Sequence, residues 1–147
     1  MDFTPEFAAV ERSMLPVGDY GVRDPEGRLF PLVIERKSKG DLFGTLATGF
    51  DRFKKEIGRA REAKIQLVLV IEATRSEVAN GFKYSMRSGS AVVKQVNTLF
   101  VKYDIPYIYA QNSFEAARII EDIFGAVVRN YGKDVKEPLH RQLDRQP

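Results

Sequence analysis

Three charged residues in the first third of the chain, Asp19, Glu35 and Lys37, have the types and spacing of a hydrolytic site. Two carboxylates can hold one Mg²⁺ or Mn²⁺ ion, which polarises a phosphoryl oxygen and lowers the pKa of a bound water. A nearby lysine stabilises the attacking hydroxide or the extra negative charge of the transition state. The sequence therefore contains a minimal set of groups for metal-dependent phosphodiester hydrolysis.

The composition leaves few other kinds of catalysis. The 147 residues include no cysteine and one histidine, His140, which lies in a polar C-terminal stretch. Thiolate chemistry and cysteine-bearing zinc sites are thus excluded, and a Ser-His-Asp triad or a histidine-rich metal site has little support. The sequence contains neither the phosphate-binding pattern Gly-x-x-x-x-Gly-Lys-Ser/Thr nor the dinucleotide-binding pattern Gly-x-Gly-x-x-Gly. The net charge of +3 and the isoelectric point of about 9.2 mildly indicate a polyanionic partner.

A predicted hairpin must bring the two carboxylates together. Residues 13–22 and 29–37 have the patterns of two strands, and the intervening Asp-Pro-Glu-Gly of residues 24–27 is a strong turn signal. In a three-residue loop with Gly27 left-handed, Asp24 pairs with Arg28.

That loop determines which faces the two carboxylates occupy. With it, Asp19 falls opposite Val33, and Glu35 becomes its diagonal neighbour on the same face, with Cβ atoms about 7–8 Å apart. A two-residue loop would place the two carboxylates on opposite faces, because a slip of one residue reverses every side chain. The chemistry therefore depends on the turn.

The rest of the chain alternates strands with helices. Asn112 and Glu115 have the spacing of a capping pair before the last helix, which we expect to end at Gly132. Residues 73–89 are expected to form one long irregular connection. This order predicts an α/β fold with a mixed sheet flanked by helices, in which residues 1–132 form the domain and 133–147 a polar tail. The other predicted elements are a helix at 50–64, strands at 65–71 and 105–110, and a helix at 90–103.

Gly18-Asp19 followed by Glu35-Arg36-Lys37-x-x-x-Asp41 resembles the XPF-type structure-specific nucleases, a branch of the restriction-endonuclease-like fold. The resemblance implies an Mg²⁺- or Mn²⁺-dependent endodeoxyribonuclease acting on branched, flap or nicked DNA. It implies that Asp19 and Glu35 bind the metal and that Lys37 is the catalytic lysine. Arg36, Asp41 and Arg52 would support the active site.

One part of the family pattern is not found. The family usually opens with a strand carrying Asp-x-Arg-Glu, for which residues 1–12 offer no match. We therefore expect an open edge beside the strand at 13–22, filled by residues 3–10 or by a second copy of the chain, and weakened catalysis. An alternative function is a catalytically weak or inactive DNA-binding subunit of the same fold. A third is a sequence-specific, restriction-like enzyme.

Basic residues mark two candidate DNA surfaces. Lys54 and Lys55 lie on the helix at 50–64, and Lys83 and Arg87 lie in residues 78–103, which contain no acid. Basic residues interleaved with aromatic ones suit a DNA backbone with exposed bases. The alternatives are an ordinary solvated helix face for the first group and a plain basic loop or a subunit contact for the second.

Three residues of the motif region have structural alternatives. Asp41 has the position of a helix N-cap, and Arg36 alternates to the face opposite Lys37 and could form an inward salt bridge. Glu72 ends the central strand, where its role is either structural or to support the site.

The longest apolar runs have five residues and the start lacks a signal-peptide pattern. We therefore expect a cytoplasmic protein (nucleoid-associated, or in the host cytoplasm if viral) with no membrane partner. The resemblance to the XPF-type nucleases also implies a homodimer formed through one of the final helices.

Overall fold

The computed structural model describes residues 9–12, for which it gives the backbone alone, and residues 17–131. Within these ranges the chain forms five strands and five helices. In chain order they are β1 (Ala9–Arg12), β2 (Tyr20–Arg23), β3 (Leu32–Lys37), α1 (Lys39–Leu46), α2 (Phe50–Glu62), β4 (Gln66–Ile71), α3 (Arg75–Ala79), α4 (Gly89–Tyr103), β5 (Tyr107–Tyr109) and α5 (Ser113–Tyr131).

The strands form one mixed sheet in the order β1-β2-β3-β4-β5. The first three strands are antiparallel, and β3, β4 and β5 are parallel. Strand β1 pairs with β2 from Ala9↔Arg23 to Arg12↔Tyr20, so the expected gap beside the first hairpin strand is filled by the chain itself. The filling segment is Ala9–Arg12, whereas the expected segment, 3–10, lies mostly outside the described residues.

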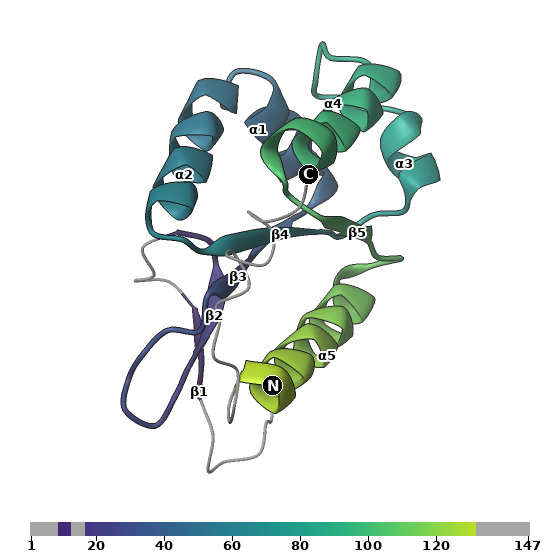
Figure 1. Cartoon of the computed structure of the whole chain (residues 1–147). Coiled ribbons are helices and arrows are strands. Elements are labelled where there is room, and N and C mark those ends of the chain that lie inside the picture. The colour runs from purple at the N-terminus through teal and green to yellow at the C-terminus, as the bar shows by residue number, and fades with distance from the viewer. Residues whose placement is uncertain (1–8, 13–16, 132–147) are drawn as a thin grey trace.

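Helices cover both faces of the sheet (Figure 1). Helices α1 to α4 lie on one face and α5 lies on the other. Strand β3 alternates between the two layers, with Val33 in the core under α1–α4 and Ile34 in the core under α5. All six residues of β4 are buried, as expected for a strand covered on both faces. No helix in the described parts of the chain has the length and apolar character that a membrane span requires.

The helix termini differ in part from the sequence prediction. Asn112 caps α5 as expected, accepting a hydrogen bond of 2.8 Å from the Glu115 N–H. Asp41 is not an N-cap; Ser38 caps α1 instead, because its hydroxyl accepts from the Asp41 N–H at 3.2 Å. The connection expected at 73–89 is interrupted by α3, which a capping box between Thr74 and Glu77 starts. The end of the domain at 132 and the tail at 133–147 lie outside the described residues.

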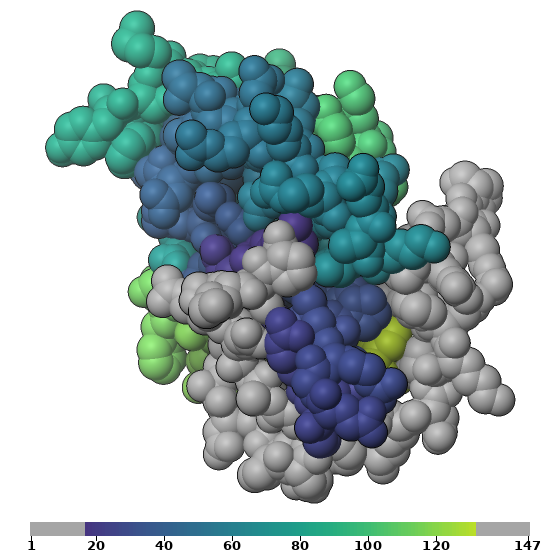
Figure 2. Space-filling view, turned by 90° about the vertical axis from the view of Figure 1, so that its left-hand side faces the viewer, coloured from purple at the N-terminus to yellow at the C-terminus, as the bar shows by residue number. Residues whose placement is uncertain are grey.

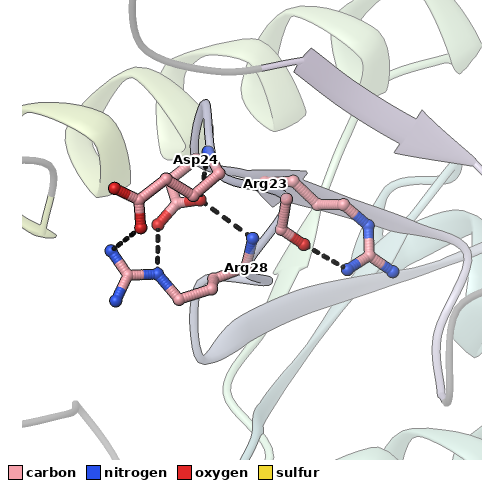
Figure 3. A network of polar contacts seen from close by, with 5 residues as sticks. Arg23, Asp24 and Arg28 are labelled. Atoms are coloured by element: carbon pink, nitrogen blue, oxygen red, sulfur yellow. Dashed lines mark hydrogen bonds and ion pairs between the residues drawn. The ribbon is translucent and has the colours of Figure 1, made fainter.

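The loop between β2 and β3 has the predicted three-residue form. On the face seen in Figure 2 this hairpin, in dark blue, projects below α1 and α2. Gly27 has a φ of +87°, and the Asp24 N–H donates to the Arg28 carbonyl at 2.8 Å. The Asp24 carboxylate accepts from the N–H of Arg28 at 2.8 Å and forms an ion pair with its guanidinium, also at 2.8 Å (Figure 3). Asp24 therefore closes the loop through both its backbone and its side chain.

The register beyond the loop differs from the prediction by two residues. Arg23 pairs with Leu29 as expected, but Tyr20 pairs with Ile34, which places Asp19 opposite Glu35 and not opposite Val33. The two extra residues lie around Pro31, which has no N–H for the ladder, and the Leu32 N–H donates back to the Phe30 carbonyl at 2.8 Å. Because the slip is even, it leaves each side chain on its expected face.

Candidate active site

A buried carboxylate, Glu35, lies at the centre of the candidate site. Its residue is only 5% exposed, on the face of β3 that α1 and α2 cover. Lys37, two residues further along the strand and on the same face, places Nζ 3.1 Å from Glu35 Oε2. The alternation of the strand thus pairs the predicted ligand with the predicted catalytic lysine.

Asp19 is held beside β3 by the backbone. Its N–H donates to the Ile34 carbonyl at 2.9 Å, and its Oδ2 accepts from the Arg36 N–H, also at 2.9 Å. These contacts fix the carboxylate at the strand position opposite Glu35. The prediction that the hairpin brings the two carboxylates together is confirmed, with a closer register than expected.

The backbone directly before Asp19 requires a glycine at position 18. Gly18 has a φ of +75°, and a Cβ at this position would lie 2.9 Å from Val33 Cγ2. Its N–H donates to Glu56 Oε1 at 3.1 Å, which ties the segment before Asp19 to α2. A side chain here would therefore move the segment that carries Asp19.

Glu56 was missed by the sequence analysis. It projects from α2 toward Gly18, and its charge acts on Glu35. The available signal was its position four residues after Arg52, which places both side chains on one helix face. Nothing in the sequence related that face to the hairpin.

The charges around Glu35 are unbalanced. Burial, together with the negative charges of Glu56 and Asp19, raises the pKa of Glu35 to about 7, against the opposing effect of Lys37. Glu35 thus has one lysine in direct contact, and two further carboxylates act on it. A divalent cation would relieve this excess negative charge.

An open groove leads to this cluster across α1 and α2. Lys37, Arg52 and Glu56 line it, and so does the exposed Asp41. Three small or short residues of the α1 region, Gly40, Gly44 and Thr48, also line it and leave room for a ligand. The structure therefore brings Asp41 and Arg52 to the same groove as Lys37.

The Arg36 side chain is placed elsewhere. It forms an ion pair with Glu72, and its guanidinium donates to the Ser113 carbonyl at 2.8 Å, at the start of α5. Among the groups of the site, it contributes only its backbone N–H, which binds Asp19. A direct catalytic role for this side chain is therefore not supported, because strand alternation sends it to the α5 face. The structural alternative, in which these side chains form a salt bridge, fits both Arg36 and Glu72.

The four candidate DNA-binding cations lie on two segments. Lys54 and Lys55 are exposed on α2, where Lys54 pairs with Asp51 at 3.3 Å. Lys83 and Arg87 are exposed in the loop between α3 and α4, where Arg87 Nε donates to Gln95 Oε1 at 2.8 Å. None of these four side chains lines the groove at the carboxylate cluster.

The described residues contain no cluster of three or more potential ligands in metal-binding geometry. Asp19 and Glu35 remain as a pair, and Mg²⁺ needs only one or two carboxylates because it keeps several waters. The excess negative charge around Glu35 fits a cation at this position. The residues present are therefore compatible with one Mg²⁺ or Mn²⁺ ion.

We predict that Gly18→Ala destabilises the fold by about 2–3 kcal/mol, since it combines a left-handed backbone with an overlap on Val33. The matched control is Gly58→Ala, in α2, where a Cβ meets no atom within 4 Å. That control should stabilise the protein by about 0.5–1 kcal/mol. Urea unfolding measures both, and equal midpoints for the two variants would contradict this account of Gly18.

We predict that Glu35→Gln raises the stability of the metal-free protein. The folded-state pKa of Glu35, about 7, exceeds the ordinary 4.5, so the wild type loses stability as pH rises through this interval. At about pH 8 in EDTA, the variant should be more stable by about 1–3 kcal/mol.

Thermal unfolding with and without Mg²⁺ tests this charge balance. Mg²⁺ should raise the melting temperature of the wild type and leave that of Glu35→Gln unchanged, because a ligand stabilises only the state that binds it. Glu62→Gln, an exposed change on α2, is the control and should behave as the wild type. A less stable Glu35→Gln would mean that Lys37 already balances the carboxylate.

Comparison with known proteins identifies a family and a fold. The family model described as "ERCC4 domain" matches residues 6–123. The solved structure of XPF from Aeropyrum pernix superposes with a TM-score of 0.60 at 20% identity, covering 80% of this chain and 52% of that one. The same protein in a complex with DNA gives 0.58 at 18% identity, covering 85% and 56%.

These structures show a shared fold, and the restriction-endonuclease-like prediction is confirmed. The chain spans about half the length of each of these structures. No curated protein matches the chain. Because the family model spans most of the sequence, including the hairpin, the candidate site and α4, the chain belongs to the ERCC4 domain family.

Proposed function

We propose that this protein is an Mg²⁺- or Mn²⁺-dependent endodeoxyribonuclease that hydrolyses phosphodiester bonds in branched, flap or nicked DNA. The observation that carries the proposal is the buried Glu35 beside Lys37 and Asp19, at an open groove. A buried carboxylate surrounded by excess negative charge lowers the stability of the fold. Binding of a metal ion would account for its presence at this position. Membership in the ERCC4 domain family supports the choice of nuclease chemistry.

Each side chain then has a role that follows from its position. Asp19 and Glu35 would hold the metal, which supplies activation of a water and of the phosphoryl oxygen. The Lys37 ammonium, 3.1 Å from Glu35, would stabilise charge that develops on the phosphate. Arg52, on the groove wall, would bind and orient a phosphate of the same strand.

The DNA partner has support from charge and from the comparisons. Exposed cations flank the site, Lys54 and Lys55 on α2 and Lys83 and Arg87 in the loop before α4. Such residues neutralise phosphates without reading the sequence. A solved structure of similar fold, XPF from Aeropyrum pernix, is a complex with DNA.

A second candidate function is a catalytically weak or inactive DNA-binding subunit. The observation in its favour is that the described residues offer a carboxylate pair and no larger ligand cluster. A cleavage assay separates the two functions. The homodimer and the cytoplasmic location remain predictions.

We predict that Asp19→Asn and Glu35→Gln each lower cleavage of labelled flap DNA by about a hundredfold or more, because the metal is lost. DNA binding should survive, since the loss of a carboxylate reduces its repulsion of phosphates. Lys37→Ala should lower kcat with little change in the Mg²⁺ concentration required, because the lysine acts on the transition state.

The control for these variants is Asp122→Asn, which removes an exposed carboxylate from α5, on the other face of the sheet. It should cleave as the wild type does. Undiminished cleavage by Glu35→Gln would reject the proposed active site. A wild type that binds flap DNA but does not cut it with either metal would favour the binding subunit.

We predict that the loop cations bind DNA without sequence preference. The double change Lys83→Ala with Arg87→Ala should weaken the binding of all DNAs alike and flatten the slope of log K against log salt by about 1.8. Fluorescence anisotropy over a salt series measures both quantities. Arg118→Ala with Arg129→Ala removes the same charge from α5, on the other face of the sheet, and should leave the slope close to the wild-type value. If the two double variants behave alike, the loop is not a DNA contact.

A further inference from the structure

The loop of residues 82–87 presents an aromatic side chain on a rigid support. The Phe82 ring packs 5.9 Å from that of Phe43 in the core, and the Tyr84 ring packs edge-on to Phe82 at 5.3 Å. Gly40 makes room for this stack, since a Cβ there would lie 3.2 Å from the Phe82 ring. Tyr84 is nevertheless 77% exposed, and Met86 next to it is fully exposed.

The loop holds this shape with its own hydrogen bonds. The Ser85 N–H donates to the Phe82 carbonyl at 2.9 Å, and the Arg87 N–H donates to the Ser85 hydroxyl at 3.1 Å. The Arg87 side chain donates a hydrogen bond to the Gln95 side chain on α4. An exposed ring held in this way can bind with little loss of conformational entropy.

The loop continues the groove of the candidate active site. A second groove, lined by Phe82, Tyr84, Met86 and Arg87, adjoins the first. Gly40, Gly44 and Thr48 line both grooves, so one surface over α1 joins Lys37 to Tyr84. Figure 2 shows the teal segment between α3 and α4 projecting at the upper left, beyond the blue α1 and α2.

The charges of the loop suit nucleic acid. The Lys39 ammonium lies 5.9 Å from the Phe82 ring centre and that of Lys83 lies 4.9 Å from the Tyr84 ring centre. Residues 78–103 contain no acidic side chain. A cationic, aromatic surface of this kind binds phosphates and stacks bases together.

We propose that this loop binds the unpaired strand of a branched DNA, with a base stacked on Tyr84 and against Met86 while a phosphate of the same DNA lies at Lys37. The identity of the nucleic acid rests on the proposed function, and the inference adds which part of the substrate is recognised. A continuous duplex keeps its base faces stacked and so offers none to Tyr84. The loop therefore selects DNA with unpaired bases next to the cut site.

The direct test uses a splayed-arm DNA with 2-aminopurine in the unpaired arm beside the junction, bound by the full chain in EDTA. We expect the fluorescence to change on binding to the wild type and to Tyr84→Phe, because stacking needs the ring and not the hydroxyl. Tyr84→Ala should lose that change and bind about 5- to 100-fold more weakly, the range measured for one base–aromatic stack. Equal melting temperatures show that the variants are folded.

The matched control is Phe114→Ala, which removes an aromatic ring of similar exposure, 72%, from α5 on the other face of the sheet. It should behave as the wild type does. With Mg²⁺, Tyr84→Ala should lower kcat/KM for the splayed-arm substrate about 5- to 100-fold and change that for nicked duplex less than about twofold.

Three outcomes would overturn this inference. They are wild-type fluorescence and affinity in Tyr84→Ala, equal losses on duplex and splayed-arm DNA, and a change of oligomeric state in Tyr84→Ala with unchanged DNA affinity. The last would assign the loop to a second copy of the chain. If the wild type cuts no DNA but its fluorescence change still requires Tyr84, the proposed function fails and the inference stands.

Discussion

The burial of the Glu35 carboxylate beside Lys37 is the interaction on which the rest of the site depends. Glu35 lies on a central strand that pairs antiparallel with β2 and parallel with β4, and only 5% of the residue is exposed. The Lys37 ammonium pairs with Glu35, and the negative charges of Asp19 and Glu56 act on the same carboxylate. A carboxylate kept ionised in such surroundings costs free energy, and a bound cation is the simplest compensation.

Strand alternation explains how three consecutive charged residues serve two purposes. Glu35 and Lys37 face the layer of α1 and α2, where the groove opens, and Arg36 between them faces α5. There Arg36 joins the end of β4, through Glu72, to the start of α5, through the Ser113 carbonyl. The same short run of chain thus supplies the site on one face and holds the opposite layer in place on the other.

A single residue connects β3 to α1. Ser38 follows Lys37 directly and caps α1, so the helix begins one residue after the strand ends. Gly40, Asp41 and Gly44 therefore lie close to Lys37 and form part of the groove. The groove is open because α1 places its glycines there, and its far end is formed by the aromatic loop that packs on Gly40. The candidate site and the aromatic loop are thus linked through a single short helix, α1.

The sequence alone indicated the chemistry and determined the turn between β2 and β3. The types and spacing of Asp19, Glu35 and Lys37 indicated a metal-dependent hydrolytic site, which stays a prediction, and the turn signal correctly predicted a three-residue loop with Gly27 left-handed, because turn type is a local property. The tertiary structure decided what local patterns do not encode. Pro31 shifted the register by two residues, since a residue without an N–H interrupts the ladder. Glu56 joined the cluster only because α2 packs over the hairpin, and Arg36 left it only because Glu72 and α5 lie on the other face.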